Sequence, residues 1–145
     1  FWFKKIISLS DLVAYVLFQI IGAIFGCLAA NIIFGLPVVT ISTHVRHDLS
    51  QFLSEILATF GLVLVIFLAR EVAKLNIPVL VGSYIASAYW FSSSTSFANP
   101  AVTIARQFSD TFTGISPSGI PLFVLAQILG AILGYIVVQW LSRDM

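Results

Sequence analysis

The sequence predicts an all-α membrane protein with four membrane-spanning helices and one re-entrant half-helix. Two compositional observations support this fold class: 59% of the 145 residues are hydrophobic and 9% are charged. Soluble domains carry about 25% charged residues. The third observation is an uncharged run over residues 77–105 that is broken twice by proline. This run is too long for a single span, which needs about 20 residues.

Four apolar runs have roughly the length of a spanning helix, the third of them only barely. They cover residues 12–34, 52–69, 77–92 and 120–141. Ser10 and Asp11 precede the first run and are candidate N-caps, because both residue types cap helices well. Polar connections separate the spans, over residues 36–51, 70–76 and 110–119. We expect one membrane domain over residues 1–145.

The polar cluster after the third run marks a second, shorter helix. Asn99 is a preferred N-cap, and Pro100 fits the first helical position because its missing N–H would have no partner there. About ten residues follow before Ser109, roughly half a membrane thickness at ~1.5 Å per residue. Unwound backbone at this depth is tolerated only where protein buries it or a watery cavity adjoins it. The pattern predicts a pore; a surface loop with a turn is the alternative.

The basic residues predict the orientation. With four alternating spans, five basic residues fall on one side of the membrane: Lys4, Lys5, Arg70, Lys74 and Arg143. Two basic residues, Arg46 and Arg106, fall on the other side. The positive-inside rule makes the first side cytoplasmic. We therefore expect a multi-pass protein of the cell (plasma or inner) membrane with a cytoplasmic C-terminus. The half-helix then enters from outside.

Two nine-residue segments form an internal repeat. FQIIGAIFG begins at Phe18 and AQILGAILG at Ala126; six of nine positions are identical, at an offset of 108 residues. Both carry Gly-x-x-x-Gly, which lets helix backbones approach closely, and Gln19 and Gln127 are expected to be buried structural support. The copies cross in opposite directions, and inverted repeats place a functional site near the midplane. A matching Asn-Pro segment is expected upstream of Phe1.

The composition argues against several function classes. A formal net charge of +1 argues against nucleic acid as a partner. The single Cys27 provides neither a disulfide framework nor a thiolate metal cluster. His44 and His47 could be two metal ligands, but no third is nearby, so we expect a solvated outer loop and no metal. No nucleophile–base pair stands out, and we expect neither an enzyme nor a cofactor.

The tripeptide Asn99-Pro100-Ala101 resembles the signature of the aquaporin (major intrinsic protein) family. Glu55, in Ser-Glu-Ile-Leu-Ala-Thr-Phe-Gly, resembles that family's buried glutamate, and the two Gln-x-x-Gly-Ala segments resemble its third and sixth helices. The resemblance covers nearly the whole chain, as the part of an aquaporin after its first Asn-Pro-Ala. It implies two half-helices that meet at the centre of a pore, and homotetramers in the lipid bilayer.

The resemblance also implies how solutes pass. Asn99 would donate a hydrogen bond to the solute, and carbonyls of the unwound backbone would accept from it, at Ser94, Thr95, Ser96 and Phe97. Each half-helix N-terminus carries roughly +0.5 of a charge, and facing ends repel cations and protons. Small neutral solutes can exchange their water shell for these groups.

The chain departs from the family pattern at the narrowest filter. The usual arginine, three residues after Asn99, is replaced by Val102, and the other two filter positions are Ser87 and Ser96. This implies a wider constriction without a fixed charge, which admits glycerol, urea or metalloid hydroxides as well as water. Arg106 is a candidate for the outer vestibule, although a side chain that only snorkels to the interface is the favoured interpretation.

The role of Glu55 distinguishes a passive channel from an ion-coupled transporter. A carboxylate in a span costs about 2.5–3.5 kcal/mol unless it is satisfied. We expect it to accept hydrogen bonds from backbone N–H groups of residues 92–97, within a passive channel. The first alternative is an ion-coupled transporter that uses Glu55. The second is a non-conducting truncated scaffold subunit, because the chain holds one half of the constriction.

Overall fold

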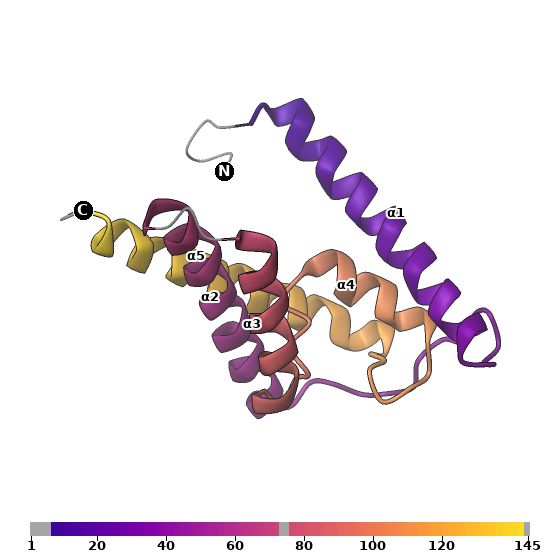
Figure 1. The fold of residues 1–145 in the computed structure, drawn as a ribbon. Coiled ribbons are helices and arrows are strands. Elements are labelled where there is room, and N and C mark those ends of the chain that lie inside the picture. Colours follow the sequence, from indigo (N-terminus) through magenta and orange to yellow (C-terminus); the bar gives the residue numbers. More distant parts are fainter. Residues whose placement is uncertain (1–6, 73–75, 144–145) are drawn as a thin grey trace. The chain divides into compact units, whose positions relative to one another are not determined.

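The computed structural model describes residues 7–72 and 76–143, and every regular element within them is helical. The elements, labelled in Figure 1 where there is room, are α1 (Leu9–Ile33), α2 (Leu49–Val72), α3 (Ile77–Phe91), α4 (Pro100–Ala105), the 3₁₀ turns η1 (Arg106–Phe108) and η2 (Pro117–Gly119), and α5 (Ile120–Leu141). The predicted all-α membrane fold class is confirmed. Lys4, Lys5 and Lys74, which the orientation prediction used, lie outside the described residues.

Within the described residues, three helices are long and apolar enough to cross a membrane: α1, α2 and α5. The 25 residues of α1 extend about 37 Å at ~1.5 Å per residue, compared with a hydrocarbon core of about 30 Å. The 15 residues of α3 extend about 22 Å and fall short of a full crossing. The third predicted span is therefore the short one, and it ends where the Ser/Thr cluster begins.

The first helix begins three residues earlier than predicted. Its N-cap is Ser8, whose hydroxyl accepts from the Asp11 backbone N–H at 3.1 Å, while the Asp11 carboxylate accepts from the Ser8 N–H at 3.3 Å. The prediction of Ser10 as the cap is wrong, and Asp11 acts from the third helical position. This reciprocal capping box satisfies two N–H groups that the first turn leaves unpaired.

A glycine ends α1. Gly35 has φ +68°, in the left-handed region that costs a residue without Cβ little. Its N–H donates to the Ile32 carbonyl and the Leu36 N–H donates to the Asn31 carbonyl, which together make a Schellman motif. The sharp turn separates the apolar helix from the polar connection that follows.

The second helix is longer than the predicted span at both ends. It begins at Leu49, where the Phe52 N–H donates to the Asp48 carbonyl, and it continues past Ala69 to Val72. Apolar runs mark the hydrocarbon boundary, whereas helical hydrogen bonding continues through charged residues that are good helix formers, such as Arg70. Arginine is also favourable in a last helical turn, because the carbonyl end of a helix is negative.

The described chain falls into two compact units. The first consists of Phe1–His44 and Ala101–Pro117, and the second of Val45–Pro100 and Ser118–Met145. The first contains α1, most of α4 and η1. The second contains α2, α3 and α5, which lie together in Figure 1.

Glycines bring α2 and α5 of the second unit into close contact. A Cβ at Gly130 would lie 2.4 Å from the Ile56 carbonyl oxygen, and one at Gly134 would lie 2.9 Å from the Phe60 carbonyl oxygen. Such backbone approach is what Gly-x-x-x-Gly allows. On the other flank of α2, the Tyr84 hydroxyl of α3 donates to the Ala58 carbonyl at 2.8 Å.

The two copies of the repeat differ in their surroundings. A Cβ at Gly22 or Gly26 would meet nothing within 4 Å. Gln19 is exposed, unlike the burial predicted for it, whereas Gln127 is buried. Close packing at the glycine pair is thus found in the second copy, whose helix α5 lies against α2.

Candidate functional site

The backbone is unwound between α3 and α4. α3 ends at Phe91 and α4 begins at Pro100, so residues 92–99 form no regular element. The predicted break is therefore present, and Pro100 does not lie inside a continuous crossing helix. Three residues of the segment have a positive φ without being glycine: Thr95 (62°), Ser96 (47°) and Ala98 (49°). Such residues cost of order 1–3 kcal/mol each and persist only where their surroundings impose the conformation.

Glu55 of α2 is the main support of this segment. Its side chain is 0% exposed. The N–H of Phe97 donates to Glu55 Oε2 at 3.3 Å, and the N–H of Ala98 donates to Oε1. Gln127 Nε2 of α5 donates to the same Oε1 at 2.9 Å. Three donors around one buried carboxylate offset its desolvation, and they join α2, α5 and the unwound segment.

Arg46 contacts the same segment from the polar connection that precedes α2. Its side chain is 4% exposed. Nη1 donates to the Ser94 carbonyl at 3.1 Å, and Cζ lies 5.2 Å from the centre of the Phe97 ring. That ring also packs against Phe123 of α5, with 5.3 Å between ring centres. The expectation that this connection is solvated is therefore wrong at Arg46, although His44 and His47 are exposed as predicted.

The predicted carbonyl ladder is partly engaged within the chain. The Ser94 carbonyl accepts from Arg46, and the Ser96 N–H donates to the Ser94 hydroxyl at 3.2 Å. Among the described residues, the buried hydroxyls of Thr95 and Ser96 have no hydrogen-bond partner. A carbonyl has two lone pairs, so the bond to Arg46 leaves one acceptor site on Ser94.

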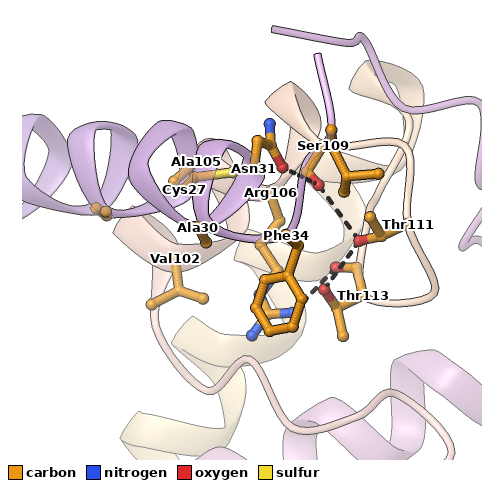
Figure 2. Close-up of a pocket in the computed structure, with 13 residues that line it drawn as sticks. Cys27, Ala30, Asn31, Phe34, Val102, Ala105, Arg106, Ser109, Thr111 and Thr113 are labelled. Carbon is orange, nitrogen blue, oxygen red and sulfur yellow. Dashed lines mark hydrogen bonds between the residues drawn. The ribbon is translucent and has the colours of Figure 1, made fainter. Parts of the chain in front are cut away.

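In the first unit, a pocket of about 660 Å³ lies between α1 and the half-helix. Figure 2 labels Val102 and Arg106 on its wall, together with Phe34 of the α1 C-cap. Arg106 Nη1 donates to the Thr113 carbonyl at 3.2 Å. Two predicted site residues thus line one pocket, an apolar side chain on α4 and a guanidinium on η1.

A chain of polar contacts borders this pocket (Figure 2). The Ser109 hydroxyl donates to Asn31 Oδ1 at 2.7 Å and lies 3.3 Å from the Thr111 hydroxyl, which lies 3.3 Å from that of Thr113. Asn31 Nδ2 donates to the Val38 and Phe108 carbonyls, each at 3.0 Å. The end of the half-helix is therefore tied to the end of α1.

The remaining filter residues belong to the second unit. Ser87 is an exposed residue of α3, and its hydroxyl donates to the Ser83 carbonyl one turn earlier at 2.9 Å. Ser96 is buried in the unwound segment. Asn99 is half-buried and directly precedes α4. A filter built from Ser87, Ser96 and Val102 stays a prediction.

Sequence reasoning missed Arg46 and Asn31. The sequence predicts Arg46 only as a charge in an outer loop, and its partner Ser94 lies 48 residues away, so no local pattern could identify the contact. Asn31 had a usable signal, because it is a lone amide near the end of an apolar run, where buried polar groups need partners. Among residues 7–72 and 76–143, no three His, Cys, Asp or Glu side chains gather closely enough to hold a metal.

Asp110 joins two polar connections of the first unit. Thr43 donates to it from its N–H at 2.8 Å and from its hydroxyl at 3.1 Å. The Thr43 N–H is the main cause that lowers the pKa of this carboxyl below 3.8, with the Thr43 and Ser42 hydroxyls and the nearby His44 adding to it against some desolvation. A lowered folded pKa stabilises the folded state above pH ~4, and this stabilisation is lost as pH falls through the folded value.

This contact gives a pH-dependent prediction. Asp110→Asn is expected to speed hydrogen exchange of the Thr43 amide about threefold at pH 7, because a charge-assisted acceptor is replaced by a neutral one. The difference between Asp110→Asn and the unchanged protein should shrink as the pH falls below ~4 and through the folded pKa of Asp110. Asp48→Asn, a change at an exposed acid of the connection that contains Thr43, is the control. A gap that does not shrink at all as the pH is lowered would contradict the assignment.

Comparison with known proteins identifies the family. No protein-family model and no solved structure matches the chain. Among curated proteins, it is similar to the aquaglyceroporin AqpS of Rhizobium meliloti (strain 1021), with 47% identity over 133 residues, which is 92% of this chain. The chain belongs to the aquaporin family. It spans 57% of the length of that aquaporin relative.

The resemblance to the aquaporin family is therefore confirmed, and so is an all-helical, multi-pass membrane fold. The buried Glu55 and the glycine contacts of α5 lie in the second unit, and most of α4 lies in the first. The solutes and the assembly remain matters for proposal.

Proposed function

We propose that this chain forms part of a passive membrane channel for water and small uncharged solutes, lined at Asn99, Pro100 and Ala101. The observation that carries the proposal is the unwound backbone over residues 92–99, which follows an apolar helix and is held by the buried Glu55. Backbone of this kind at membrane depth requires burial in protein or a watery cavity. The name of the relative, an aquaglyceroporin, supports the same solute class.

Broad selectivity for glycerol, urea or metalloid hydroxides fits the residues available. Val102 adds neither charge nor a long side chain to the pocket it lines. The buried hydroxyls of Thr95 and Ser96 have no partner among the described residues, and leaving a buried hydroxyl unpaired costs about 1–3 kcal/mol. A water or hydroxylated solute that hydrogen-bonded there would recover part of that cost.

The channel is proposed to be a homotetramer of the cell membrane with a cytoplasmic C-terminus, and Arg106 is proposed to line its outer vestibule. The hydrogen bond from Arg106 to the Thr113 carbonyl supports this role, because it holds the guanidinium at the pocket wall. A side chain that only snorkelled to the interface would not need that partner.

Stopped-flow light scattering on proteoliposomes of the full-length protein tests the function. Vesicles shrunk by glycerol or urea should reswell at least tenfold faster than empty vesicles. Passage of water with none of these solutes would remove the broad-selectivity proposal. A full-length protein that passes neither water nor solutes would favour the non-conducting scaffold.

Val102→Arg tests the constriction. The added guanidinium should lower glycerol and urea permeability at least tenfold and water permeability by less than threefold, because it narrows and charges a position that valine leaves open. Val102→Ala, which widens the same position without charge, should keep or raise glycerol flux. Equal glycerol flux in Val102→Arg and the unchanged protein would show that Val102 does not face the solute path.

A further inference from the structure

We propose that Arg46 supplies the fixed positive charge beside the channel's outer constriction. The charge comes from the connection before α2 and not from the half-helix, where Val102 is neutral. The proposal rests on the proposed channel function and assigns ion exclusion within it to a residue outside the Asn-Pro-Ala segment. It replaces the expectation of a constriction without a fixed charge.

The contacts place the guanidinium against Ser94 and Phe97, which flank the predicted filter position Ser96 in the sequence. Nη1 lies 3.1 Å from the carbonyl oxygen of Ser94, two residues before Ser96. Cζ lies 5.2 Å from the ring centre of Phe97, the residue directly after Ser96. A hydrogen bond on one side and a ring contact on the other hold the charge against the unwound segment.

Arginine suits this position physically. Its guanidinium stays charged at all physiological pH values, is weakly hydrated and stacks on aromatic rings. Because Arg46 is 4% exposed, salt screens its charge far less than that of a surface side chain. At low dielectric a fixed charge repels a like charge over several ångströms, so Arg46 need not touch a cation to exclude it.

The position of Glu55 sets the order in which a solute meets the two charges. Glu55 accepts from Phe97 and Ala98, at the end of the segment nearer Asn99, whereas Arg46 binds Ser94 at the other end. In the predicted orientation, Ser94 lies at the end of the unwound segment that is nearer the outside of the cell. A cation from outside therefore meets the positive charge before it meets the carboxylate, whose oxygens already accept from Phe97, Ala98 and Gln127.

A purely structural role for Arg46 makes different predictions from the electrostatic one. A structural role needs the forked donor and the ring contact, which lysine and glutamine both reproduce poorly. An electrostatic role needs the charge alone, which lysine keeps and glutamine loses. The pair Arg46→Lys and Arg46→Gln therefore separates the two roles in one assay.

The experiment uses the full-length protein in planar bilayers and proteoliposomes. Arg46→Gln should raise potassium conductance at least tenfold while glycerol and water permeabilities stay within twofold. Arg46→Lys should stay within threefold of the unchanged protein in all three measurements. Arg143→Gln, which removes an exposed arginine beyond α5, should change none of them.

Two further variants, a second neutral substitution and a double variant that restores the charge, serve as additional controls. Arg46→Met keeps the apolar stem and is the second neutral variant, for use if Arg46→Gln does not give folded protein. Combining either neutral variant with Val102→Arg should restore low potassium conductance, because a positive charge then returns at the family's usual filter position. This rescue would not occur if Arg46 only held the backbone in place.

The inference is overturned if the neutral variants leave potassium conductance unchanged. It is also overturned if Arg46→Lys and Arg46→Gln lower all three permeabilities together, since that pattern indicates a structural brace. Failure of the proposed function looks different, because the unchanged protein itself would then pass neither water nor glycerol.

Discussion

Glu55→Gln is expected to lower the free energy of unfolding by about 1–3 kcal/mol, the cost of leaving a buried hydrogen-bond donor without its acceptor. The Glu55 carboxylate accepts from two backbone N–H groups of the unwound segment and from Gln127. Glutamine offers one oxygen and turns an NH₂ group toward donors that then lose their acceptor. Solute flux should fall together with the stability of the folded state, because the segment over residues 92–99 loses its support.

Thermal unfolding of the purified full-length protein measures this loss, and hydrogen exchange at Phe97 and Ala98 locates it. Glu55→Asp, which keeps both acceptor oxygens on a stem one methylene shorter, should be intermediate. The structural role of Glu55 would be contradicted if the Glu55→Gln protein kept its stability while solute uptake lost its pH dependence. That outcome would favour the ion-coupled transporter.

Gly130→Val is expected to destabilise the α2–α5 contact by about 3 kcal/mol, at the upper end of the usual range for overpacking. A Cβ at Gly130 would lie 2.4 Å from the Ile56 carbonyl oxygen, 3.0 Å from Thr59 Cβ and 3.1 Å from the Phe60 nitrogen. Two of these neighbours are backbone atoms of α2, which a rotamer change cannot move. The helices must therefore separate, which also disturbs the contact between Gln127 and Glu55.

Thermal unfolding in detergent compares Gly130→Val with Gly82→Val as its matched control. Gly82 lies on α3, and a Cβ there would meet nothing within 4 Å. The control should keep its stability or gain up to about 1 kcal/mol, because valine has a higher helix propensity than glycine. Equal losses in the two variants would mean that close α2–α5 packing does not depend on Gly130.

Much of the fold followed from local chemistry. The α5 boundaries at Ile120 and Leu141 agree with the predicted last span, and the break before Pro100 agrees with the predicted half-helix. Apolar run length and proline act within a few residues, so both are readable from sequence. The errors occurred at helix ends, where Ser8 and Asp48 extend helices beyond the apolar runs.

The sequence by itself determined that this is a helical membrane protein of the aquaporin type, interrupted at Asn99-Pro100, because hydropathy and backbone restriction are properties of short segments. The tertiary structure alone decided which polar groups meet. Arg46 binds Ser94 across 48 residues, Glu55 binds Gln127 across 72, and Asn31 binds Ser109 across 78. Buried polar groups must find partners, but which partner each finds depends on how distant helices pack.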